Sequence, residues 1–74
     1  MDIPYLGYTL RITALRNARG DTVQGYWAVL DGQPDDDQSP LFEGITVEMP
    51  AWALAQREAK AEAIGWLANY VIGP

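Results

Sequence analysis

Apolar and polar residues alternate most regularly over residues 8–16, which read Tyr-Thr-Leu-Arg-Ile-Thr-Ala-Leu-Arg. Successive side chains of a strand point to opposite faces. One face would therefore be apolar (Tyr8, Leu10, Ile12, Ala14) and the other polar (Thr9, Arg11, Thr13). This pattern predicts a half-buried β-strand.

A turn follows at residues 17–21, Asn-Ala-Arg-Gly-Asp, where Asn17 and Gly20 tolerate a positive φ. Residues 22–30 then predict a returning strand, with Tyr26, Trp27 and Val29 at its centre. The two strands are expected to form a hairpin.

The stretch at residues 31–40, Asp-Gly-Gln-Pro-Asp-Asp-Asp-Gln-Ser-Pro, predicts a flexible acidic loop because it has no apolar pattern. A third strand is predicted over residues 41–49. One side of it would carry Leu41, Ile45, Val47 and Met49, and the other Phe42, Gly44, Thr46 and Glu48. Pro50 ends this strand, and we expect it to pair with the second.

The last part of the chain predicts a helix, because residues 56–71 lack proline and are mainly good helix formers. Its start is expected between residues 50 and 56, since Pro50 suits a first helical position. Spacings of three and four define an inward stripe made of Ala59, Ala63, Trp66, Leu67, Tyr70 and Val71.

These elements predict one α+β domain over residues 1–74. A three-stranded antiparallel sheet in β-β-β-α order would carry one C-terminal helix on one face. A helix about 10 Å wide largely covers three strands spaced at about 4.8 Å. The opposite face of the sheet would then have no cover from the chain.

Composition restricts the classes of function. The 74 residues contain no cysteine and no histidine, which excludes disulfides and removes the commonest zinc ligands. Self-association is then the remaining support for a small core. Ten acidic residues against five basic ones disfavour nucleic-acid binding. Neither a signal peptide nor a membrane span is visible, so we expect a soluble, cytoplasmic protein.

The sequence provides no catalytic, cofactor-binding or metal-binding set, so we do not expect an enzyme. Ser39 is the only serine and has no histidine to activate it, while Glu43 and Glu48 would point to opposite faces of one strand. The aspartates at 35–37 offer carboxylates for a hard cation, but they lack the spacing of a calcium loop. A solvated, self-repelling turn is the favoured interpretation.

The most informative feature is the aromatic content, with three tryptophans and four tyrosines. If Tyr26, Ala28 and Leu30 join the helix-facing side, an interface patch forms on the uncovered face. Its residues would be Trp27, Val29, Phe42 and Arg11, with Trp52 as a further contributor. A shift of one residue in the second strand reverses this and buries Trp27. Trp66 lies on the helix stripe and is expected in the core.

The run Tyr5-Leu6-Gly7-Tyr8-Thr9-Leu10, followed by a hairpin, a third strand and an alanine-rich helix with a late tryptophan, resembles small bacterial proteins of unknown function. Residues 44–48, Gly-Ile-Thr-Val-Glu, are similar to the stretch that leads into the helix of HicB-like antitoxin domains. The second resemblance implies an antitoxin or RNA-associated regulatory role.

We therefore predict a small, non-enzymatic protein-interaction or self-association module. Its partner would be another protein chain, with a second copy of itself as the first candidate. A HicB-like antitoxin or RNA-associated domain is the alternative, and a small hydrolase or metal-dependent enzyme is a third class.

Overall fold

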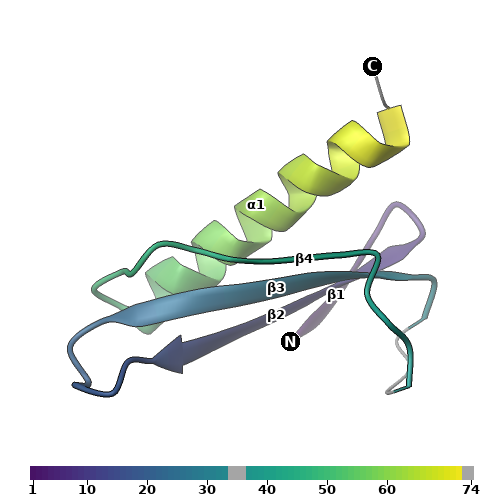
Figure 1. The fold of residues 1–74 in the computed structure, drawn as a ribbon. Helices are drawn as coiled ribbons and strands as arrows, with labels where there is room; N and C mark the ends of the chain where they lie inside the picture. The colour runs from purple at the N-terminus through teal and green to yellow at the C-terminus, as the bar shows by residue number, and fades with distance from the viewer. Residues whose placement is uncertain (34–36, 73–74) are drawn as a thin grey trace.

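The computed structural model describes residues 1–33 and 37–72, which form a four-stranded antiparallel sheet with one long helix on one face (Figure 1). The strands run β1–β2–β3–β4 in both sequence and space. Their bounds are β1 Asp2–Tyr5, β2 Tyr8–Arg16, β3 Val23–Asp31 and β4 Phe42–Ile45, followed by helix α1 Trp52–Ile72. The α+β class and the C-terminal helix are confirmed, but the prediction of three strands was wrong.

The additional strand, β1, forms a hairpin with β2 through a two-residue turn. Leu6 and Gly7 both have positive φ, at 52° and 83°, as a type I′ turn requires. The N-terminal ammonium also bonds to the carbonyl of Ile12 at 2.9 Å. Pro4 argues against an inner strand, but an edge strand tolerates it. This explains why the apolar pattern did not reveal β1.

The loop between β2 and β3 is one residue longer than predicted, and this reverses the faces of β3. The N–H of Asn17 donates to the carbonyl of Thr22 at 2.9 Å, which closes a loop over residues 17–22. Ile12 is therefore paired with Trp27 rather than with Tyr26. Opposed residues share a face, so the shift moves Trp27 to the face of Ile12.

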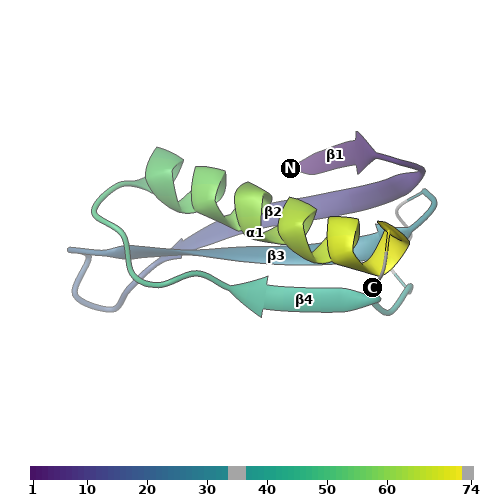
Figure 2. The same cartoon turned by 90° about the horizontal axis from the view of Figure 1, so that it is seen from above.

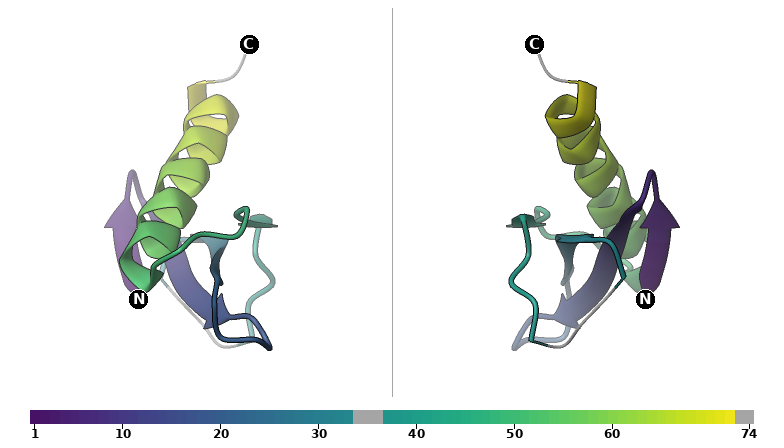
Figure 3. Two further views of the ribbon diagram at one scale, coloured as in Figure 1. Left: turned by 90° about the vertical axis from the view of Figure 1, so that its left-hand side faces the viewer. Right: turned by 90° about the vertical axis from the view of Figure 1, so that its right-hand side faces the viewer.

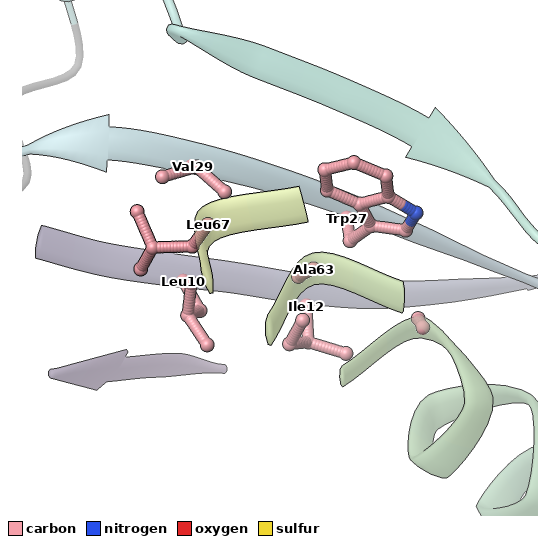
Figure 4. Packing of buried hydrophobic residues seen from close by; sticks show 7 residues of the cluster. Leu10, Ile12, Trp27, Val29, Ala63 and Leu67 are labelled. Atoms are coloured by element: carbon pink, nitrogen blue, oxygen red, sulfur yellow. The ribbon is translucent and has the colours of Figure 1, made fainter. Parts of the chain in front are cut away.

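The prediction that Trp27 and Val29 lie on the uncovered face was therefore wrong. Trp27 is 4% exposed and Val29 is fully buried. Both point towards the helix, together with Leu10 and Ile12 (Figure 4). The alternative register, with Trp27 inside and Tyr26 outside, is the one that the chain adopts.

A bulge after β4 reverses the predicted faces of the third predicted strand. Tyr26 pairs with Ile45 and Val23 with Met49, so the segment that follows β4 has one more residue than β3 between the two pairs. Thr46 fills the bulge, and its hydroxyl accepts the Gly25 N–H at 2.9 Å. Consequently Ile45 is exposed, while Met49 packs against the core.

Phe42 also lies on the helix face, because it pairs directly with Val29. Its prediction as a residue of the uncovered face was therefore wrong. The sequence pattern had placed Phe42 and Ile45 on opposite faces of one strand, with Phe42 on the outward face beside Trp27. The bulge and the shifted register of β3 together move Phe42 to the helix face.

Helix α1 buries a line of mostly small residues spaced by four: Ala55, Ala59, Ala63 and Leu67, all fully buried. It starts within the predicted interval and runs to Ile72, the last described residue. Trp66, Tyr70 and Val71 were predicted to face inward, but about half of each side chain is exposed. The spacing of four makes a narrow stripe, so residues beside it lie on the flank of the helix.

The helix lies close to the sheet at its start and rises away from it towards its C-terminus (Figure 1). It also crosses the sheet obliquely, so that its C-terminal half lies on the β4 side (Figure 2). Gly25 permits the close approach, because a Cβ there would collide with the Ala55 carbonyl and lie 2.9 Å from the Ala59 Cβ. The space between helix and sheet is therefore a wedge.

The described parts of the connection from β3 to β4, residues 32–33 and 37–41, lie on the side of the sheet away from the helix (Figure 3). Thr9 donates its hydroxyl to the Gly32 carbonyl at 2.6 Å, which holds the start of this connection under β2. Residues 34–36 lie outside the described residues, so the flexible acidic loop and the reading of Asp35–Asp37 stay predictions. In the described part of the chain, the helix is not long and apolar enough to cross a membrane.

Candidate functional site

Five aromatic side chains form a continuous row in the wide part of the wedge. We define the aromatic row as Tyr8, Tyr70, Phe42, Trp66 and Trp27. The ring centroids of Tyr8 and Tyr70 are 6.4 Å apart, and those of Tyr70 and Phe42 are 4.9 Å apart. Phe42 stacks on Trp66 at 5.8 Å, and Trp66 lies 6.4 Å from Trp27. The row joins β2, the helix, β4 and β3.

Trp27 anchors the row from below. Its ring extends over Gly44 of the neighbouring strand, where a Cβ would lie 2.6 Å from the Trp27 Cε2. Its indole N–H donates to the Glu62 carboxylate at 3.3 Å. Trp27 thus has both an apolar cover and a polar partner, which a buried tryptophan requires.

The two members of the row that belong to the helix are open to solvent. Trp66 is 54% exposed and Tyr70 is 53% exposed. A shallow hollow of about 290 Å³ runs along this flank of the helix, lined by Glu62, Gly65, Trp66 and Asn69. Exposed, partly supported aromatic rings are typical anchors in protein interfaces.

Strand β4 forms the edge of the sheet next to this row. Thr46 donates its N–H to the Gly25 carbonyl at 2.9 Å, and Tyr26 faces Ile45. In an antiparallel ladder, these two observations identify Tyr26 and Ile45 as a pair without mutual hydrogen bonds. The N–H and C=O groups of Glu43 and Ile45 therefore point outward. In the sheet of the described residues, β4 has only β3 as a neighbour.

The two edges of the sheet differ in how they are protected. β1 carries Pro4, which removes a backbone donor, and the Asp2–Arg11 ion pair lies beside it. β4 has no proline, and the exposed apolar residues Leu41, Ile45 and Val47 lie on it or adjoin it. An unprotected edge with apolar neighbours favours pairing with another strand.

Arg11 lies where the sequence predicted, on the sheet face away from the helix, but its surroundings are different. Its Nε and Nη2 donate to the two Asp2 carboxylate oxygens at 3.0 and 3.1 Å. This bond lowers the pKa of the Asp2 carboxyl below its ordinary 3.8. The predicted set is therefore divided: Trp27, Val29 and Phe42 are on one face, and Arg11 is on the other.

The uncovered sheet face is a weaker candidate than the β4 edge. Leu30 and Thr9 at its centre are buried, and Tyr26 is 37% exposed. A hollow of about 440 Å³ opens between the β1–β2 hairpin and Gly32, lined by Asp2, Pro4, Gly7, Tyr8, Thr9, Gly32 and Gln33. Among the described residues that line it, the Asp2 carboxylate already accepts bonds from Arg11, and the phenol of Tyr8 is the other ionisable group. The described lining therefore does not bring together a carboxylate pair or a nucleophile with a base.

A polar cluster at the β2–β3 loop has a structural role. The Asn17 amide donates to Asp21 at 2.8 Å and to Thr22 at 2.6 Å, and Thr22 donates to Glu48 at 2.8 Å. These bonds fix the loop that sets the register of β3. Among the described residues, no group of three or more acidic, histidine or cysteine side chains is placed to hold a metal ion.

Sequence reasoning missed Trp66 and Tyr70 as surface residues. A signal existed, because Ala55, Ala59, Ala63 and Leu67 form a complete line at spacing four, which leaves Trp66 and Tyr70 one position off it. Comparison with family models, with curated proteins and with solved structures finds no match. The resemblance to HicB-like antitoxins therefore stays a prediction.

Proposed function

We propose that this chain is a non-enzymatic protein-interaction module that accepts an additional β-strand on β4. The observation that supports it best is the juxtaposition of an unprotected strand edge with the half-exposed rings of Trp66 and Tyr70. The partner is another protein chain that presents an extended segment.

The two features have complementary roles in this mode of binding. Outward backbone groups of Glu43 and Ile45 give main-chain hydrogen bonds that do not depend on the partner's sequence. The rings of Trp66 and Tyr70 lie above the edge and select apolar side chains of the added strand. Leu41 and Val47 extend the apolar border at the two ends of β4.

Site-specific photo-cross-linking in the cells that produce the protein tests this proposal. Trp66→p-benzoylphenylalanine places the reactive group beside β4, and Trp52→p-benzoylphenylalanine is the matched control. Both positions carry exposed tryptophans on the same helix, at 54% and 42% exposure, but Trp52 lies at its opposite end. We expect discrete protein adducts from position 66 and none from position 52. An absence of adducts at 66, or equal adducts at both positions, would contradict the proposal.

A further inference from the structure

We infer that the strand added to β4 is β4 of a second copy of this chain, paired antiparallel about a two-fold axis at Gly44. The inference rests on the proposed function and specifies its partner. The backbone of β4 is self-complementary in this one register, and the side chains around the axis permit it.

The hydrogen-bonding groups define which residues can face each other. The outward groups belong to Glu43 and Ile45, so a mutual hydrogen-bonded pair must join these residues across the axis. Pairing Glu43 with Ile45 of the second copy uses all of them and forms four main-chain bonds in two equivalent pairs. Gly44 then faces Gly44, in a pair without mutual bonds, where the backbones approach most closely.

Two other registers are possible in principle, and each meets an obstacle. Centring the axis on Glu43 places the two Glu43 carboxylates directly opposite each other, which is destabilising. Centring the axis on Ile45 requires Glu43 of one copy to pair with Val47 of the other. The bulge between Ile45 and Met49 interrupts the regular edge at that position. Residues 42–46 remain as the regular segment, and Gly44 is its middle residue.

The arrangement of the helices is compatible with this register at the seam, the junction between the two β4 strands. Both helices would lie on the same side of a continuous eight-stranded sheet, because the axis is perpendicular to the sheet. The C-terminal half of each α1 already lies on the β4 side (Figure 2). Trp66 of each copy would border the seam, because it stacks on Phe42 of β4 and lies beside the Trp27 ring, which extends over Gly44. Such a two-fold interface uses the same patch of both copies.

Sedimentation equilibrium over a wide concentration range tests the inference with two matched variants. Wild-type protein should pass from 8.2 kDa to twice this mass as concentration rises. Ile45→Pro removes an outward N–H without breaking a bond to β3, and should weaken the dimer at least about tenfold because each copy loses one bond. Ile45→Val keeps the N–H and should dimerise as wild type. A monomeric wild type, or a proline variant that dimerises equally, overturns the inference.

Single cysteines test the register, since the natural chain has none. A mixture of the Glu43→Cys and Ile45→Cys proteins should form disulfides faster than either protein alone. Faster bonding within Glu43→Cys alone or Ile45→Cys alone contradicts an axis at Gly44. The two proposals also fail separately: a monomeric protein whose Trp66 adducts contain other proteins loses the second copy but keeps the interaction function. If position 66 gives no adducts at all, both the interaction function and the second copy are contradicted.

Discussion

The two ends of the helix–sheet wedge are built from opposite kinds of residues. At the narrow end, Gly25 lies under Ala55 and Ala59, and the helix backbone nearly touches the sheet. At the wide end, the aromatic row fills a gap that no small residue could fill. Both ends belong to the same helix and the same strand β3.

This difference shows how one helix produces both a closed core and an open surface. Small residues let the helix begin in close contact, and its oblique path then carries it away from the sheet (Figure 1). The gap at the far end needs large rings, and rings such as Trp66 and Tyr70 reach beyond the wedge into solvent. The surface therefore follows from the geometry that closes the core.

The largest difference is expected between two tryptophans of the aromatic row. Trp27→Ala removes a buried ring and should cost about 3–5 kcal/mol in the free energy of unfolding. Trp66→Ala removes a half-exposed ring with two aromatic contacts and should cost about 1–2 kcal/mol. Urea denaturation followed by circular dichroism measures both. Equal losses of stability would contradict the assignment of Trp27 as the buried member of the row and Trp66 as a half-exposed one.

The narrow end is tested by replacing its glycine. Gly25→Ala should cost about 3 kcal/mol, because the methyl group would collide with the Ala55 carbonyl and force the helix outward. The control is Gly65→Ala on the exposed flank, where no atom lies within 4 Å of the new Cβ. That change should stabilise the helix by about 0.5–1 kcal/mol. A tolerated Gly25→Ala would mean that the wedge has no narrow end.

Gly44→Ala should have an intermediate effect at the wide end, of about 1–3 kcal/mol, because the new methyl group meets the side chain of Trp27 rather than backbone. The Trp27 ring must turn away from β4, and its bond to Glu62 should be lost. Near-ultraviolet circular dichroism and the chemical shift of the indole proton report this change. Unchanged indole signals would contradict the position of the Trp27 ring over Gly44.

The smallest effect is expected at the β1 edge. The pKa of Asp2 is lowered in the folded protein by its bond to Arg11, so the pair stabilises the fold above pH 3.8, and this contribution is lost as pH falls below that value. Asp2→Asn should therefore lower stability slightly at neutral pH and not at all in stronger acid. Thermal melting of both proteins across this range measures the difference. A stability gap that widens in acid would contradict the assignment.

The class of fold was readable from the sequence because β2 and the helix have clear periodicities. The faces of β3 were not, because both of its alternating sets are largely apolar. Its register depends on whether the preceding loop has five residues or six, and the bonds of the Asn17 side chain decide this. A similar single-residue event, the bulge at Thr46, reversed the end of the third predicted strand.

The candidate site was less predictable than the fold for the same reason. Aromatic content drew attention to Trp27 and Phe42, which lie in one row in the structure. Their depth depended on register, and the exposure of Trp66 and Tyr70 depended on the tilt of the helix. The tilt is a consequence of Gly25 meeting Ala55 across two elements, which no local pattern reveals.

Amide hydrogen exchange measured at low and at high protein concentration tests most directly whether the β4 edge is a pairing surface. The N–H groups of Glu43 and Ile45 should exchange rapidly at low concentration and at least about tenfold more slowly at high concentration, when a second copy covers them. The exposed turn amide of Ala18 should not change. Equal exchange at Glu43 and Ile45 under both conditions would contradict the pairing of β4 with itself.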